Sequence, residues 1–181
     1  MYIVIVGIAV AAILLVYSTT VRSSADPLVN KQLLSIAEAM LEEVQLMPFT
    51  LCDPDDANAA TATVLADCAT TPEAIGPEGA ESRYSAADPF DNVNDYHGFD
   101  TATAALPGIR DITGAPIATL AGYRAQVSVT TQAVGPGGSQ VAGAGANGPQ
   151  SLLITVTASA PGGDALSLSG YRTRYAPAAV P

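Results

Sequence analysis

The stretch Pro27–Met47, PLVNKQLLSIAEAMLEEVQLM, decides the expected fold, because its apolar residues recur at helical spacing and Pro48 ends it. Asp26 is a suitable N-cap, and Pro27 suits the first turn. Polar residues fall on the other faces of this helix, namely Lys31, Glu38, Glu42 and Glu43. The pattern predicts an amphipathic helix that packs one face on a globular head. The residues expected to make this contact are Leu33, Ile36, Met40 and Val44.

Upstream of this helix, Met1–Tyr17 reads MYIVIVGIAVAAILLVY and is apolar on every side of a helix. Residues 1–21 carry no charged side chain. A helix of that length rises about 32 Å, enough to cross a hydrocarbon core of about 30 Å. We expect this segment to lie in a membrane or in the core of a filament. Small residues would let neighbouring helices approach closely there, and they are Gly7, Ala9, Ala11 and Ala12.

Charge is scarce along the 181 residues. There are 17 acidic and 7 basic residues, the formal net charge is −10, and only 13% of residues are charged. This balance argues against a nucleic-acid partner, since such binding depends on Lys and Arg neutralising phosphates. With 49% hydrophobic residues, the low charged fraction indicates a chain that lies partly in a membrane or packs against copies of itself.

The distribution of charge and the change of period predict three regions. Residues 1–47 are expected to form a helical rod, with a membrane or filament-core half at 1–21 and an amphipathic half at 27–47, either as two abutting helices or as one helix bent at Pro27. Residues 48–111 form an acidic loop region. In residues 112–181 the period becomes two, which predicts an antiparallel β-meander.

Three segments of the C-terminal region alternate apolar and polar residues: Gly122–Val134, Ser151–Ala160 and Ala165–Ala176. Pro161–Asp164 is a tight turn between the last two. We expect at least three antiparallel strands, with one face of the sheet free to accept the helix.

Cys52 and Cys68 are the only cysteines. In an exported chain two cysteines most simply form one disulfide, worth about 3 kcal/mol on the chain-entropy model. A structural zinc site needs more ligands, and a redox pair would have the closer C-x-x-C spacing. The sequence therefore predicts a Cys52–Cys68 disulfide.

Acidic residues gather beside the cysteines and in the segment DPFDNVNDYHGFD. Oxygen ligands in a loop suit calcium, although the spacing does not fit an EF-hand because Val93 stands where a ligand should be. The alternative is a solvated loop in which Asp and Asn cap their own backbone. The candidate calcium ligands are Asp88, Asp91, Asn92, Asn94, Asp95 and Asp100, and no other cofactor is expected.

We expect no catalytic residues and no enzymatic activity. His97 is the only histidine, and neither a G-x-S-x-G nor an H-E-x-x-H motif is present. The run Gly143–Gly148 matches the dinucleotide fingerprint G-x-G-x-x-G, but Pro149 and a predicted strand come after it instead of a helix. We interpret it as a hairpin loop.

Three stretches resemble minor pilin-like proteins of the mannose-sensitive haemagglutinin (MSHA) type IV pilus. They are ADPLVNKQLLSIAEAMLEEVQLMPFTLCDPDD (25–56), PFDNVNDYHGF (89–99) and GYRTRYAP (170–177). The resemblance implies an α+β, type IV pilin-like fold, in which a long N-terminal α-helix packs on an antiparallel β-sheet head. It also implies a structural or assembly role as a minor pilin. The implied partners are other pilin subunits, the pilus assembly machinery and the inner membrane.

The same resemblance implies an inner-membrane protein with its head in the periplasm, which becomes extracellular after pilus assembly. Pilin precursors carry a basic leader that ends in Gly before a Phe-Thr-Leu-Ile-Glu-like start, and Met1-Tyr-Ile-Val resembles the residues after that Glu. We therefore expect the natural start to lie upstream of Met1. Two alternatives stay open: a periplasmic binding domain on a single membrane span, such as a calcium-dependent adhesin, and a type II secretion pseudopilin.

Overall fold

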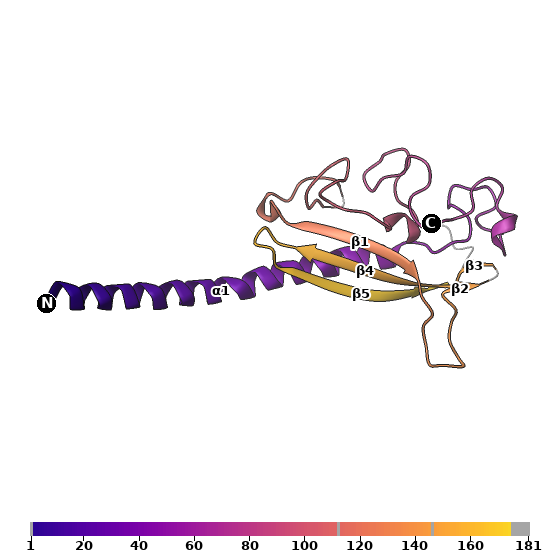
Figure 1. Ribbon diagram of the computed structural model, residues 1–181. Helices are drawn as coiled ribbons and strands as arrows, with labels where there is room; N and C mark the ends of the chain where they lie inside the picture. The colour runs from indigo at the N-terminus through magenta and orange to yellow at the C-terminus, as the bar shows by residue number, and fades with distance from the viewer. Residues whose placement is uncertain (1, 112, 146, 175–181) are drawn as a thin grey trace.

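One long helix and a small sheet form the framework of the chain. The computed structural model describes residues 2–111, 113–145 and 147–174, and it describes their side chains except those of residues 2–5, 8, 9 and 15–26. Helix α1 (Tyr2–Leu46) runs through Pro27 without interruption. Its C-terminal part lies along the sheet, whereas its front part extends away from the rest of the chain (Figure 1).

The sheet has three antiparallel strands in the order β1-β4-β5, namely β1 (Arg124–Thr131), β4 (Ser151–Ser159) and β5 (Ala165–Thr173). These are the three strands that the alternating pattern predicts. Val156 of β4 pairs with Val127 of β1 on one side and with Leu168 of β5 on the other. Along β1 and β4, buried residues alternate with more exposed ones, and nearly all of the buried residues are apolar, so one face of the sheet is apolar.

That face and one side of α1 enclose the main core. The four residues expected to contact the head are all buried in one cluster with residues of β1 and β4. The helix contributes Leu33, Ile36, Ala37, Met40 and Val44, and the two strands contribute Ala125, Val127, Val129, Leu152, Ile154, Val156 and Ala158. A Cβ added at Gly170 of β5 would meet the side chains of Gln45 and Leu41, so the glycine leaves room for these helix side chains against the strand.

The expected fold class, a type IV pilin-like α+β fold with a long N-terminal α-helix packed on the sheet, is wrong. The helical segment that packs on the sheet is only Pro27–Leu46, and the sheet is small. The reason is a match of lengths. Strands of nine residues span about 30 Å, the rise of about 20 helical residues. The sheet therefore has no room for the residues before Pro27.

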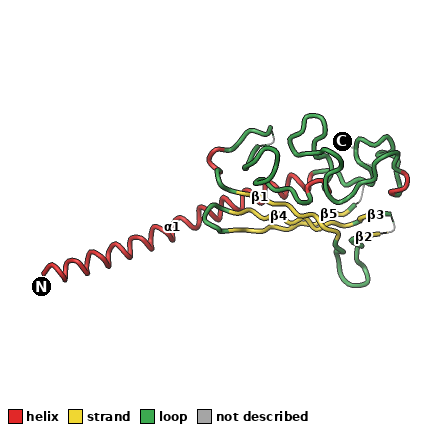
Figure 2. Tube along the Cα trace, turned by 45° about the horizontal axis from the view of Figure 1, so that its top comes forward, coloured by secondary structure: helices red, strands yellow, loops and turns green. Residues whose placement is uncertain are grey.

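Long loops between α1 and β1 fill the space beside the sheet. Their described residues include three 3₁₀ turns: η1 (Leu65–Asp67), η2 (Asn94–Tyr96) and η3 (Ala118–Leu120). Figure 2 shows these loops gathered on the β1 side of the sheet. Gly98 and Thr101 donate backbone hydrogen bonds to β1, which pairs the outer edge of that strand. The predicted hairpin loop after β1 carries a small pair of strands, β2 (Ala144–Gly145) and β3 (Gly148–Pro149).

The helix–sheet contact predicts that substitutions of two adjacent leucines will lower the free energy of unfolding by very different amounts. Leu33 is fully buried in the core, and Leu34 is exposed on the other side of α1. Leu33→Ala should lower the free energy of unfolding by about 3 kcal/mol, and Leu34→Ala by about 0.5 kcal/mol or less. Denaturant unfolding of the full chain in mild detergent, followed by circular dichroism, measures both. Equal losses for the two variants would contradict the packing described here.

Candidate functional site

The front of α1, the part before Pro27, carries exposed apolar side chains where its side chains are described. Four of the described side chains there, Val6, Val10, Ile13 and Leu14, are between 49% and 67% exposed. Of the predicted small packing residues, Gly7, Ala11 and Ala12 are exposed, and Ala9 lies outside the described side chains.

The predicted membrane or filament-core segment, residues 1–21, falls mostly on residues whose side chains are not described. Within the described part of the chain, no helix is both long and apolar enough to cross a membrane.

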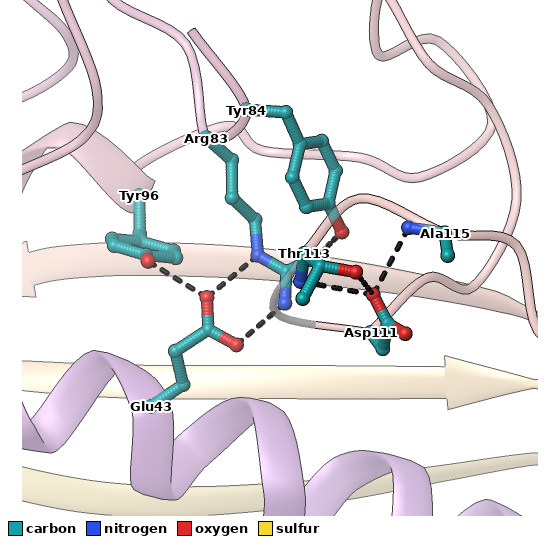
Figure 3. A network of polar contacts seen from close by, with 7 residues as sticks. All are labelled: Glu43, Arg83, Tyr84, Tyr96, Asp111, Thr113 and Ala115. Atoms are coloured by element: carbon teal, nitrogen blue, oxygen red, sulfur yellow. Dashed lines mark hydrogen bonds and ion pairs between the residues drawn. The ribbon is translucent and has the colours of Figure 1, made fainter. Parts of the chain in front are cut away.

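A buried ion pair ties α1 to the loops. Arg83 donates from Nε and Nη2 to the two carboxylate oxygens of Glu43 at 2.6 and 2.5 Å, and the Tyr96 hydroxyl donates to the same carboxylate at 2.8 Å (Figure 3). The side chains of Glu43 and Arg83 are only 15% and 6% exposed. Arg83 also donates to the hydroxyl of Tyr84. Burial, and then the negative charge of Glu43, raise the pKa of Tyr96 above its ordinary value.

Helical periodicity places Glu43 on a polar face, so sequence reasoning missed this pair. Glu43→Ala should lower the free energy of unfolding by about 3 kcal/mol or more, because it leaves Arg83 buried without its partner. Glu42→Ala changes an exposed residue on the same helix and serves as the control. Replacing both partners, Glu43→Leu with Arg83→Met, should recover most of the loss in the same unfolding measurement. If Glu43→Ala and Glu42→Ala unfold alike, the pair contributes nothing to stability.

Three loop segments meet beside the disulfide. Cys52 and Cys68 form the predicted disulfide. Next to it, Asp53 donates its backbone N–H to Thr71, and Glu73 donates its own to Leu51. The backbone N–H of Gly76 then donates to the carbonyl of Asn94 in η2. These hydrogen bonds bring segments 51–55, 71–78 and 91–95 together.

Six carboxylates from these segments form two clusters. The inner cluster is Glu73, Glu78 and Asp95, and one oxygen of each lies within 4.8 Å of the others. The outer cluster, Asp53, Asp55 and Asp91, is equally close. A polar pocket of about 300 Å³ is lined by all three residues of the outer cluster and by Glu78 of the inner one, so it connects the two.

Two of the three carboxylates of the inner cluster are buried, and Glu78 is half-buried. Glu73 is 5% exposed and Asp95 is 1% exposed. Burial first, and then neighbouring carboxylates, raise the pKa of Glu73, and burial is likewise the main cause that raises the pKa of Asp95. Burial also raises the pKa of Asp91 to about 6 and of Glu81 to about 7. The region therefore resists carrying all of its negative charges at once.

The calcium ligands expected from the sequence are not brought together as one set. Asp100 instead accepts a hydrogen bond from Nε of Arg124 at 2.7 Å, in an ion pair, and Asp88 is exposed. Asp91 belongs to the outer cluster and Asp95 to the inner one. Asn92 and Asn94 are buried beside them in the chain. Sequence reasoning missed Glu73 and Glu78, and the only available signal was their position just after the second cysteine.

Two further groups have structural partners. The Nδ1 atom of His97 accepts the backbone N–H of Val129 at 3.2 Å. The carboxylate of Asp56 accepts backbone hydrogen bonds from Asn58, Ala69, Thr70 and Thr71. These bonds hold the pKa of Asp56 well below its ordinary value of 3.8 and close the disulfide loop on itself.

The lowered pKa of Asp56 predicts that the stability of the fold depends on pH. Because the pKa of Asp56 is lower in the folded chain than in the unfolded one, its ionised form stabilises the fold above about pH 5, and this contribution is lost as the pH falls further. Asp56→Asn should therefore lower the melting temperature at pH 7, and the difference from wild type should shrink toward pH 2. Asp164→Asn, in the exposed turn before β5, is the control. A difference that does not change with pH would refute the role of the charge.

No protein-family model matches this chain, and no curated protein or solved structure is significantly similar to it. Two features of the described residues bear on function: the exposed apolar front of α1 and the acidic pocket beside the disulfide. They are far apart, because the loops that form the pocket begin only where α1 ends (Figure 1).

Proposed function

We propose that this chain is a structural or assembly subunit of an MSHA-type type IV pilus, in which the front of α1 packs among the apolar helices of other subunits. The resemblance of three sequence stretches to minor pilins suggests that these other subunits belong to a pilus filament. The observation that carries the proposal is the front of α1, which extends away from the head with exposed apolar side chains. The proposal assigns no catalytic step to the chain.

The exposed front of α1 needs a partner for energetic reasons. Moving one Val, Leu or Ile side chain fully out of water stabilises a protein by about 1.5–3 kcal/mol. Val10, Ile13 and Leu14 lie within five residues and are all largely exposed. A contiguous apolar surface of this kind is uncommon on a monomer that functions alone, and it indicates an interface.

Small residues in the front of α1 indicate that its final partner is another helix and not lipid. Gly7 and Ala11 are four residues apart, so they lie on the same side of α1 and let another helix approach closely. A Cβ added at Gly7 would meet no described atom within 4 Å, so the glycine is not needed for packing against the described residues of the chain. In the proposed pathway the front of α1 lies in the inner membrane, with the head in the periplasm, until the assembly machinery adds the subunit to the pilus.

A substitution at Gly7 tests this proposal directly. Gly7→Leu adds bulk where the isolated chain has open space, and it should reduce the protein in sheared pili several-fold while leaving the folded head unchanged. Val10→Leu also enlarges an apolar residue, but it fills no small-residue position, so it should be incorporated like wild type. Immunoblots of sheared pili and of membranes measure both.

The two alternatives predict other outcomes. A domain on a single membrane span would be found only in the membrane fraction, and Gly7→Leu would have no effect because lipid adapts to the shape of a helix. A type II secretion pseudopilin would be absent from pili, and its loss would impair secretion. Either result would overturn the proposal.

A further inference from the structure

We propose that Glu73, Glu78 and Asp95, the inner cluster, bind a divalent cation of the calcium type. One carboxylate oxygen of each residue lies within 4.8 Å of the other two, a spacing that a single ion at their centre can bridge. The three residues come from two loop segments that the backbone hydrogen bonds beside the disulfide hold together.

A second observation points to a ligand in the cluster. Oε1 of Glu73 and Oδ1 of Asp95 are both completely buried, and neither has a hydrogen-bond partner among the described residues. A buried carboxylate oxygen without a donor is costly, and native structures normally supply a donor or a metal ion. The other oxygen of Asp95 accepts the backbone N–H groups of Asp91 and Asn92, so this carboxylate is held firmly in place.

Two of the arginines are paired with carboxylates outside the cluster. The described ion pairs join Glu43 to Arg83 and Asp100 to Arg124. Arg174 is the basic group whose charge acts on Glu73. However, Arg174 donates to the carbonyl of Thr50 at 2.9 Å and lies over the ring of Phe49. The negative charges of Asp53 and Asp91 also act on Glu73, in addition to those of the cluster itself.

The ligand chemistry favours calcium. The donors are all hard carboxylate oxygens, His97 is engaged with β1, and both cysteines are in the disulfide. The buried amide oxygens of Asn92 and Asn94, next to Asp95 in the sequence, also have no hydrogen-bond partner among the described residues. Further oxygen atoms of the kind that calcium accepts are therefore close in the chain.

The pocket supplies a route for the ion. Glu78 lines the polar pocket together with Asp53, Asp55 and Asp91, so one inner ligand reaches the cavity that the outer cluster surrounds. A pocket lined by one sign of charge raises the local concentration of counter-ions. The outer cluster thus attracts the cation, and the inner cluster holds it.

Calorimetry with Ca²⁺ alone, on the full chain in detergent with its disulfide intact, tests the site. We expect one Ca²⁺ per chain and a higher melting temperature in Ca²⁺ than in EDTA. Glu73→Gln should weaken binding at least tenfold, and Asp164→Asn should bind like wild type. The measurement needs no pilus, so its failure and that of the proposed function are independent.

A comparison of melting temperatures separates lost binding from lost folding. In EDTA, Glu73→Gln should be about as stable as wild type, because glutamine has nearly the same size and burial already disfavours a charge on Glu73. In Ca²⁺, wild type should be the more stable. Glu78→Gln, at a less buried position, provides a second variant if Glu73→Gln does not fold. Absence of binding to the folded chain at millimolar Ca²⁺ would overturn the proposal. So would binding that Asp55→Asn abolishes while Glu73→Gln and Glu78→Gln leave it intact.

Discussion

The packing of residues 27–46 of α1 on one face of the sheet is the constraint on which the rest of the structure depends. Strands of nine residues and a helix of about 20 residues have nearly the same length, so the sheet is covered once this part of α1 is in place. Leu33, Met40 and Val44 are buried in that contact. The same match of lengths leaves the front of α1 beyond the sheet, and the apolar side chains described there, such as Ile13 and Leu14, are exposed and available to other molecules.

The helix also positions the acidic pocket. Glu43 extends from α1 into the loops, where it binds Arg83 and Tyr96, and Tyr96 belongs to the same 3₁₀ turn as Asp95. On the other side, residues 98–101 pair with the edge of β1. Asp95 is thus held between the helix and the sheet, and the disulfide loop brings Glu73 to it. A cation at the inner cluster would link these loops and so stabilise the end of the head that lies far from the front of α1.

The elements with a clear period could be predicted from the sequence. Alternation located β1, β4 and β5, helical spacing identified residues such as Leu33 and Val44, and the two cysteines indicated their disulfide. Features that depend on contacts between distant loops could not be predicted. Glu43 looks like a solvent-exposed residue until Arg83, 40 positions later, is known to face it. Asp91 and Asp95 are neighbours in sequence but belong to different clusters, and the inner cluster is completed by Glu73 and Glu78. The resemblance to pilins implied a long N-terminal helix packed on the sheet, whereas only residues 27–46 pack on this small sheet.

The central claim is that α1 has two roles, one half packed on its own sheet and the other half packed on other subunits. Site-specific photo-cross-linking in cells tests this most directly, with the reactive residue placed at Ile13 in the exposed front or at Glu38, an exposed position of the packed half. The account predicts that Ile13 cross-links to the apolar N-terminal helix of another pilus subunit, identified by mass spectrometry, and that Glu38 does not. Cross-links from Ile13 to lipid alone, or the same products from both positions, would contradict it.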